Sequence, residues 1–271
     1  NTAVGDRAGA AVTTGTQNTL IGGLAGDAQT TSSGNTALGY AALTDNVLGS
    51  NSVAIGRNAL NGQAPSTATD MYNVAVGNNA GEAITTGTLN TFMGGLAGDA
   101  LTDADSNVAI GTHTLSSDTL GSKTTAVGQA ALYAQNFTTA TDTFNTAVGY
   151  HAGVSVTTAV NNTLIGGLSG DALTTGSNNT TLGKGSLSAM TTGNSNVAIG
   201  INALTSDTLG ARNIAIGVGS LETQNFTSAT NVFNNAVGYS AGTAITTGIK
   251  NNLFGGNAGL ALTDADFNTA L

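Results

Sequence analysis

The sequence contains no cysteine and no tryptophan, and its one proline is Pro65. The missing cysteine excludes disulfide frameworks, thiolate metal sites and cysteine nucleophiles. A single proline excludes collagen-like and proline-rich tracts, although glycine supplies 39 of the 271 residues. The chain must therefore be held together by hydrogen bonds and by the packing of small side chains.

Charged side chains are also scarce, at 8% of the residues, compared with about 25% in ordinary soluble domains. Six Lys and Arg residues stand against fifteen Asp and Glu residues, so the net charge is -9. This sign disfavours phosphate neutralisation on nucleic acid and docking on anionic lipid. No apolar run reaches the roughly 18 residues that span a bilayer. We expect no nucleic-acid partner and no membrane-embedded part in this segment.

A five-residue block of the type Asn-Thr-Ala-Val-Gly recurs along the whole chain. It begins at residues 1, 18, 35, 52, 73, 90, 107, 124, 145, 162, 179, 196, 213, 234, 251 and 268. Twelve of the steps between successive blocks are 17-residue steps, and three are 21-residue steps. This period predicts a single repeat array over 1–271, which starts and stops inside the repeat and is expected to continue beyond it. Positions below are counted from the first residue of each block.

A slower rhythm groups four blocks into a supermodule of about 72 residues. Position nine is Gly in some blocks, such as Gly9 and Gly26, and Leu in others, such as Leu43 and Leu60. We interpret the two types as two ways of filling the same interior. The three longer blocks carry insertions at 61–72, 133–144 and 222–233.

The period predicts an all-β parallel β-solenoid, because so short a repeat holds no amphipathic helical run and one short strand cannot bury a face alone. We expect 17-residue coils with three 21-residue coils. The glycine at position five suits a corner that needs positive φ, and the Asn at position one predicts a stacked ladder. We expect positions two and four to point inward, the Ala at position three to point outward, and the small residue at position eight to let neighbours approach.

The blocks at 51–56, 107–111, 196–200 and 213–217 read Asn-Ser-Val-Ala-Ile-Gly or a close variant. They resemble the head repeats of YadA-like trimeric autotransporter adhesins. Longer Asn-Thr-Ala-Val-Gly arrays, as in the blocks at Asn145 and Asn234, also look like those of phage tail-fibre proteins. The resemblance implies a left-handed β-roll, three chains packed side by side, and attachment to a host surface. The adhesin units are typically shorter than the repeat found here, and this sequence shows no stalk or membrane-anchor pattern.

Catalytic residues are not indicated, because convergent titratable groups are lacking. The two histidines, His113 and His151, both fall at position seven of coils two steps apart. Stacked coils would place the two side chains about 10 Å apart within one chain, which is too far for them to share one metal ion. Three copies of one histidine around a three-fold axis remain an alternative. We therefore predict no enzyme, no cofactor and no confident metal site; a β-helix carbohydrate enzyme would need paired carboxylates on one face.

A weak calcium signal lies in two acidic turns, which contain Asp103 and Asp105, and Asp264 and Asp266. Each spaces oxygen side chains as a calcium loop begins, but neither has the glycine or the closing Glu of an EF-hand. Adjacent threonines such as Thr13 and Thr14 suggest ice binding as another function. Neighbouring residues on a strand point to opposite faces, however, so a Thr-x-Thr pattern would make a better flat array.

The insertions are the best candidates for ligand or subunit contact, because scarce aromatic residues gather there. These residues are Tyr72, Phe137, Phe144, Phe226 and Phe233. The alternative is that they cover the solenoid or pack between chains.

We expect a homotrimer in which outward Ala columns and position-eight residues pack between chains. Its function would be a structural and adhesive fibre segment, an adhesin head or a tail fibre. It would bind a host receptor or glycan from an extracellular location, on a bacterial surface or a virion. A monomeric ice-binding or calcium-stiffened solenoid is the alternative.

Overall fold

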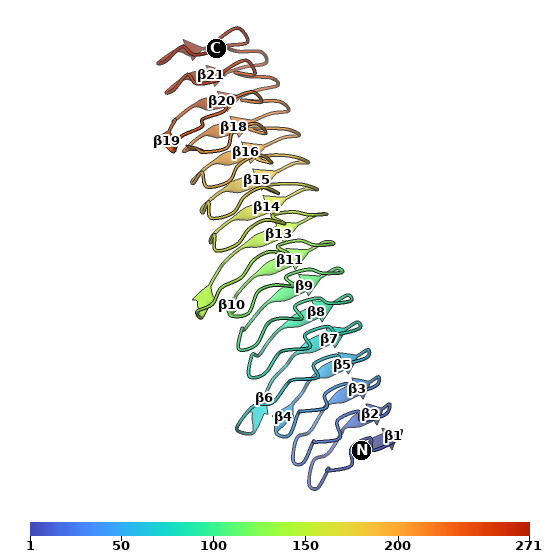
Figure 1. The fold of residues 1–271 in the computed structure, drawn as a ribbon. Coiled ribbons are helices and arrows are strands. Elements are labelled where there is room, and N and C mark those ends of the chain that lie inside the picture. The colour runs from blue at the N-terminus through green and yellow to red at the C-terminus, as the bar shows by residue number, and fades with distance from the viewer. The chain divides into compact units, whose positions relative to one another are not determined.

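The computed structural model describes residues 1–271 and contains strands and turns but no helix. The chain divides into two compact units, Asn1–Thr143 and Phe144–Leu271. In each unit the strands of successive coils lie one above the next (Figure 1). All pairings are parallel and join equivalent positions of successive blocks, which confirms the all-β parallel β-solenoid.

The main sheet of the first unit has eight strands in chain order. They are β1 (Thr2–Val4), β2 (Thr19–Ile21), β3 (Thr36–Leu38), β5 (Val53–Ile55), β7 (Val74–Val76), β8 (Thr91–Met93), β9 (Val108–Ile110) and β11 (Thr125–Val127). Equivalent positions pair throughout, so Thr19 is opposite Thr36 across a coil of ordinary length. The same register holds across a longer coil, where Val53 pairs with Val74.

The second unit repeats this arrangement with its own eight strands. They are β13 (Thr146–Val148), β14 (Thr163–Ile165), β15 (Thr180–Leu182), β16 (Val197–Ile199), β18 (Ile214–Ile216), β20 (Asn235–Val237), β21 (Asn252–Phe254) and β22 (Thr269–Ala270). Here Ile214 pairs with Asn235 across the longer coil. The extra residues are thus absorbed outside the strand without a shift of register.

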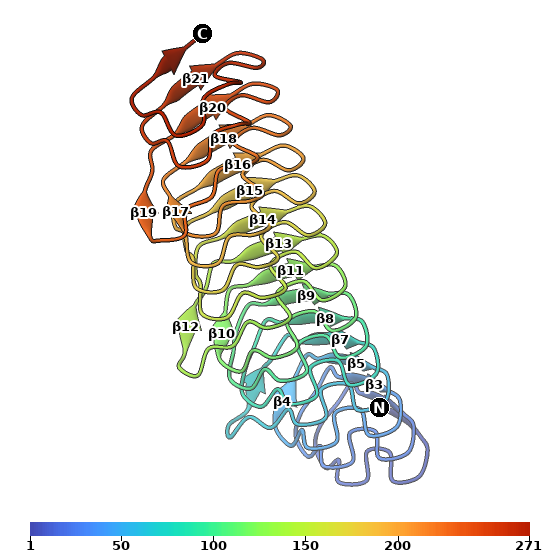
Figure 2. The ribbon, with the colours of Figure 1, turned by 45° about the horizontal axis from the view of Figure 1, so that its top comes forward.

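Each insertion adds one short strand pair away from the main sheet (Figure 2). The pairs are β4 (Gly49–Ser50) with β6 (Thr69–Asp70), β10 (Gly121–Ser122) with β12 (Thr141–Asp142), and β17 (Gly210–Ala211) with β19 (Thr230–Asn231). In every pair the first strand belongs to the preceding coil. The insertions are therefore ordered extensions of the coil.

The asparagines at position one form the buried ladder that the sequence predicts. The side-chain oxygen of Asn162 accepts the backbone N–H of Asn179 in the next coil at 2.9 Å. The side-chain nitrogen of Asn179 donates to the carbonyl of Gly193 at 3.0 Å and so closes its own coil. Both groups of the amide are satisfied in the interior, as buried polar groups require.

The direction of the strand side chains is opposite to our prediction. Position three points inward, so Ala37, Ala54 and Phe92 are fully buried, whereas Leu38 and Met93 at position four are exposed. Position eight is interior too, as at Ala25 and Ala97. The reason is the period of two in a strand: residues one and three share a face, and the buried Asn takes position three inward with it. The expected outward Ala columns therefore do not exist.

The two coil types fill one interior in complementary ways. Where position nine is Gly, a large side chain at position three of the same or the next coil occupies the space. A Cβ added to Gly81 or to Gly98 would lie 2.5 Å from the ring of Phe92, so one Phe covers two glycines. In the other type, a buried Leu at position nine, such as Leu115, accompanies a buried Ala at position three, such as Ala109.

Glycine at position five is required twice over. Gly22 has a φ of 133°, in a region that side chains with a Cβ avoid. A Cβ on Gly22 would also lie 2.4 Å from the carbonyl oxygen of Gly39 in the next coil. The predicted corner with positive φ is confirmed.

The ladder leads to a first prediction. Asn179→Ala removes the acceptor of the Asn196 N–H and the donor to the Gly193 carbonyl. Two buried groups without partners cost about 2–5 kcal/mol of unfolding free energy together. Urea denaturation measures the loss, and Thr175→Ala, an exposed threonine, is the control. An equal midpoint for both variants would contradict the role of the ladder.

The shared interior leads to a second prediction. Gly98→Ala forces the ring of Phe92 to move and lowers the unfolding free energy by about 1–3 kcal/mol. In a Phe92→Ala background the added Cβ no longer meets the ring and has only Leu101 Cδ1 nearby, at 3.3 Å. The same change then costs less, so a double-mutant cycle shows coupling. Gly95→Ala is the control, since its Cβ would meet only the Asn78 carbonyl oxygen at 3.9 Å. Additive effects of the changes at 92 and 98 would refute the packing account.

Candidate functional surfaces

A buried polar network anchors the second and third insertions. At the third insertion, the side-chain oxygens of Asp207 accept from the Gln224 amide at 2.6 Å, the Phe226 N–H at 3.1 Å and the Gly210 N–H at 3.0 Å. Asp118 and Gln135 repeat these contacts at the second insertion. The signal in the sequence was a polar residue at position twelve of the coil before each insertion, which our sequence reading missed.

The five predicted aromatic residues fall into two groups. Phe137 and Phe226 are only 6% and 8% exposed and so fold back against the solenoid. Tyr72, Phe144 and Phe233 end the three insertions and are 52%, 55% and 41% exposed. Each of these three has a positive φ, between 50° and 58°. The second group alone is available for contact with a ligand or another chain.

The exposed aromatic at the end of the third insertion belongs to a column of alternating rings and cations. The Arg212 guanidinium carbon lies 5.5 Å from the centre of the Phe233 ring. Lys250 Nζ lies 4.9 Å from the centre of the Phe267 ring. These four residues immediately precede position one of four successive coils. The quadrupole of an aromatic ring attracts a cation above its face. These contacts hold two positive charges at the surface of an acidic protein.

The carboxylates of the first acidic turn accept hydrogen bonds from residues of the preceding coil. Asp103 accepts hydrogen bonds from the Thr85 and Thr86 hydroxyls at 2.7 and 2.9 Å. Asp105 accepts the Thr88 N–H at 2.6 Å.

Asp266 plays the same part in the second unit, where it accepts the Ile249 N–H at 2.8 Å. Asp264 accepts the Thr263 hydroxyl at 3.1 Å. No three His, Cys, Asp or Glu side chains come together as a metal cluster. Calcium at these four residues stays a prediction.

The histidines contact aromatic rings. His151 stacks on Tyr150 with ring centres 3.9 Å apart, and His113 meets Tyr133 edge-on at 6.2 Å. Burial raises the pKa of the nearby Asp171 carboxyl, an effect that its backbone hydrogen bonds and the charge of His151 oppose.

The outer face of each main sheet carries an apolar column at position four, which we call the position-four column. Its members are Val4, Ile21, Leu38, Ile55, Val76, Met93, Ile110 and Val127 in the first unit, and Val148, Ile165, Leu182, Ile199, Ile216, Val237, Phe254 and Leu271 in the second. Several are strongly exposed, among them Leu182 at 49% and Phe254 at 44%. The others, such as Ile165 and Ile199, are half-buried. An aligned run of apolar side chains at the surface is typical of an interaction surface.

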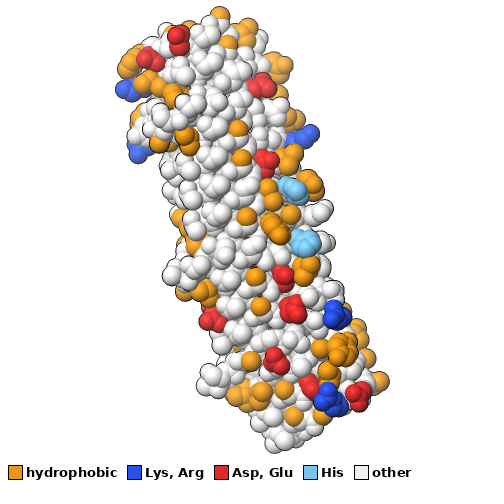
Figure 3. Space-filling view, viewed as in Figure 1, with side chains coloured by type: hydrophobic (Ala, Val, Ile, Leu, Met, Phe, Trp, Pro, Cys, Tyr) orange, Lys and Arg blue, Asp and Glu red, His pale blue; other side chains and the backbone are white.

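Charge is sparse and scattered on the face in view in Figure 3. Lys123 and Asp142 form an ion pair of 2.6 Å beside the second insertion.

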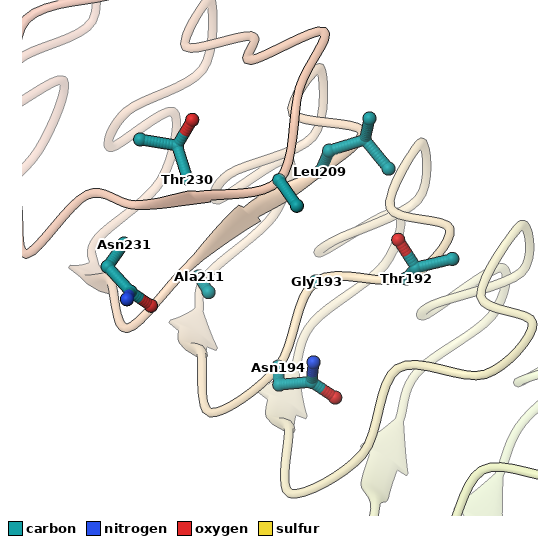
Figure 4. Close-up of a pocket in the computed structure, with 8 residues that line it drawn as sticks. Thr192, Gly193, Asn194, Leu209, Ala211, Thr230 and Asn231 are labelled. Atoms are coloured by element: carbon teal, nitrogen blue, oxygen red, sulfur yellow. The ribbon is translucent and has the colours of Figure 1, made fainter.

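A small hollow lies beside the third insertion. It has a volume of about 210 Å³ and is lined by Thr192, Gly193, Asn194, Leu209, Ala211, Ala229, Thr230 and Asn231. Figure 4 shows these residues around it, with Thr230 and Asn231 on β19 and Ala211 on β17. The lining combines two amides, two hydroxyls and small apolar groups, without a charged side chain. Nothing in our reading of the sequence had singled out this position.

Comparison with known proteins finds no family model and no curated protein that matches this chain. The structure has no helix with the length and apolar character needed to cross a bilayer.

Proposed function

We propose that the chain is a structural segment of an attachment fibre, in which three copies pack side by side through their position-four columns. The observation that carries this proposal is the apolar column itself, present in every coil of both units. Each square ångström of apolar surface removed from water contributes about 25 cal/mol. A surface of this extent favours a partner.

A second copy of the chain is the partner that fits the column best. The parallel strands hold the apolar side chains of each unit at the regular spacing of neighbouring rungs. Another copy has the same spacing, so its column meets this one rung for rung. The resemblance to adhesin heads and tail fibres supports three copies, and with it an extracellular position on a bacterial surface or a virion.

The Asp207 carboxylate lies in the network that anchors the third insertion, and the Asp171 carboxyl lies near His151. The outer sheet face and the ends of the insertions are the exposed features that another molecule meets. We propose that the sheet face joins copies and that the insertions meet the attachment target.

Assembly is tested by labelling one introduced thiol, since the chain has no cysteine. Leu182→Cys stands in the column between Ile165 and Ile199 of the paired strands. Coverage by another copy slows maleimide labelling about tenfold or more relative to Thr175→Cys, because thiol reactivity follows access. Adding Ile165→Glu and Ile199→Glu separates the copies and restores the rate.

Two outcomes of this experiment would contradict the proposal. One is labelling of the Leu182→Cys variant as fast as that of the Thr175→Cys variant in concentrated native protein. The other is slow labelling that the two glutamates leave unchanged, because burial within a single chain would then be the cause. Circular dichroism of each variant confirms that the solenoid persists.

Ice binding by a single chain is the second candidate, and the direction of the strand side chains favours it. Positions two and four share the outer face, so Thr146 and Val148, or Thr163 and Ile165, form a Thr-x-apolar array in register. This is a better array than the adjacent threonines considered from sequence. Thermal hysteresis that Thr163→Lys abolishes would support it; no hysteresis at millimolar protein would exclude it.

A further inference from the structure

The third insertion differs from the other two in three residues that lie side by side on successive coils. Hydrogen bonds and strand pairing align Asn194, Ala211 and Asn231. All three line the hollow described above. Their counterparts are Ser33, Ser50 and Asp70 at the first insertion, and Asp105, Ser122 and Asp142 at the second. The strand pairing is the same at all three insertions, so the insertions differ here in their side chains.

The first difference is a missing hydroxyl. At the first insertion the Ser50 hydroxyl accepts the Ser33 N–H at 3.0 Å, and at the second the Ser122 hydroxyl accepts the Asp105 N–H at 2.9 Å. Ala211 has no side-chain acceptor. The N–H of Asn194 therefore makes no hydrogen bond within the chain, and a ligand hydroxyl in the hollow is placed to accept it.

The second difference is a missing acid. Asn51 donates to the Asp70 carboxylate at 2.8 Å, and Lys123 pairs with the Asp142 carboxylate at 2.6 Å. The residue equivalent to these two donors is Arg212, and the residue equivalent to the two acids is Asn231. Arg212 forms no ion pair and lies against the Phe233 ring. Its charge is left for an external anion.

The donors at the other two insertions show which residue a side chain at the position of Arg212 can reach. Both Asn51 and Lys123 contact the insertion residue that corresponds to Asn231. Asn231 lines the hollow. An anion held beside Asn231 is therefore within reach of Arg212, and a guanidinium binds a carboxylate by two parallel hydrogen bonds.

We propose that this hollow binds one ring of a saccharide that carries a carboxylate, such as a uronic acid. Its volume is below the roughly 300–1,000 Å³ of pockets for drug-sized ligands, which suits a single sugar ring. The side-chain oxygen of Asn194 already accepts the Ser177 N–H at 2.6 Å, so its amide nitrogen is the group that meets the ligand. This nitrogen, the Asn231 amide and the Thr192 hydroxyl bind ring hydroxyls. Leu209, Ala211 and Ala229 contact the apolar side of the ring, and Arg212 binds the carboxylate.

This assignment deepens the proposed attachment function, because it names the ligand class that one insertion meets. It does not depend on the number of copies, since all the named residues lie in the second unit of one chain. A failure of binding with native assembly would refute this assignment alone. Binding by a chain that does not assemble would refute the trimer alone.

The test compares methyl glucuronide with methyl glucoside, which differ in the carboxylate, by saturation-transfer NMR on the intact protein. We expect the glucuronide to bind about tenfold or more tightly than the glucoside, because charge-assisted bonds are the stronger kind. Asn231→Asp restores the acid found at the other insertions, neutralises Arg212 and weakens glucuronide binding about tenfold. Ala211→Ser refills the hydroxyl position and weakens both sugars.

Asn231→Asp is expected to fold normally, because Asp occupies the same position as Asp70 and Asp142. Lys184→Gln removes another exposed charge of the second unit and serves as the matched control, with an expected change below about twofold. Equal binding of the two glycosides would overturn the proposal. So would no binding of either, or glucuronide binding that Asn231→Asp leaves unchanged.

Discussion

The buried amide at position one is the constraint on which the rest of the structure depends. As at Asn162 and Asn179, the amide oxygen accepts a backbone N–H of the next coil, and in most coils the amide nitrogen donates to a carbonyl near the end of its own coil. The two bonds fix both the length of the coil and its height above the last one. Because these asparagines are buried, a coil that loses the amide leaves backbone groups without partners. The two blocks without Asn begin with Ser52 and Thr124, and there Gln63 and Gln135 reach the hydroxyls instead.

The same constraint decides which side of the strand is core. With Asn buried, position three is buried too, and it is mostly Ala because neighbouring Leu side chains at position nine already fill the space. The larger side chains at position four are left outside. A reader of the sequence expects Val, Ile and Leu to be inside and Ala outside, since burial of large apolar groups is the stronger general tendency. In this protein the burial of the asparagine ladder outweighs that tendency and sets the direction of the strand side chains.

Much of the fold is readable from the sequence because repetition removes ambiguity. The period gives coil length, parallel pairing and register, and glycine at position five gives the corner, since only one residue type tolerates both its φ and its contact with Gly39. The hollow was not readable in the same way. It depends on which hydroxyl or carboxylate is absent at Ala211 and Asn231, and that absence has meaning only once the pairing with the preceding coil is known. The anchoring carboxylate of Asp207 was hidden for the same reason.

The three insertions show how a regular scaffold carries variation. The bases of the second and third insertions repeat one network, in which Gln224 and Asp207 correspond to Gln135 and Asp118. At the first insertion Asn46 bonds only Gly49, and Gln63 bonds Ser52 and Asn73. Their outer residues differ in charge and size, with the acid–base pair at Lys123 and Asp142 replaced by Arg212 and Asn231. The sheet face keeps its apolar column through all of this. We infer a division between one surface that joins copies and another that varies.

The central claim is that this chain works as several copies joined through the position-four column. Sedimentation equilibrium of the unaltered protein tests it most directly, because the mass of the particle in solution counts the copies. The account predicts a particle of three chains, each of 26.4 kDa. A single species with the mass of one chain at every concentration would contradict it.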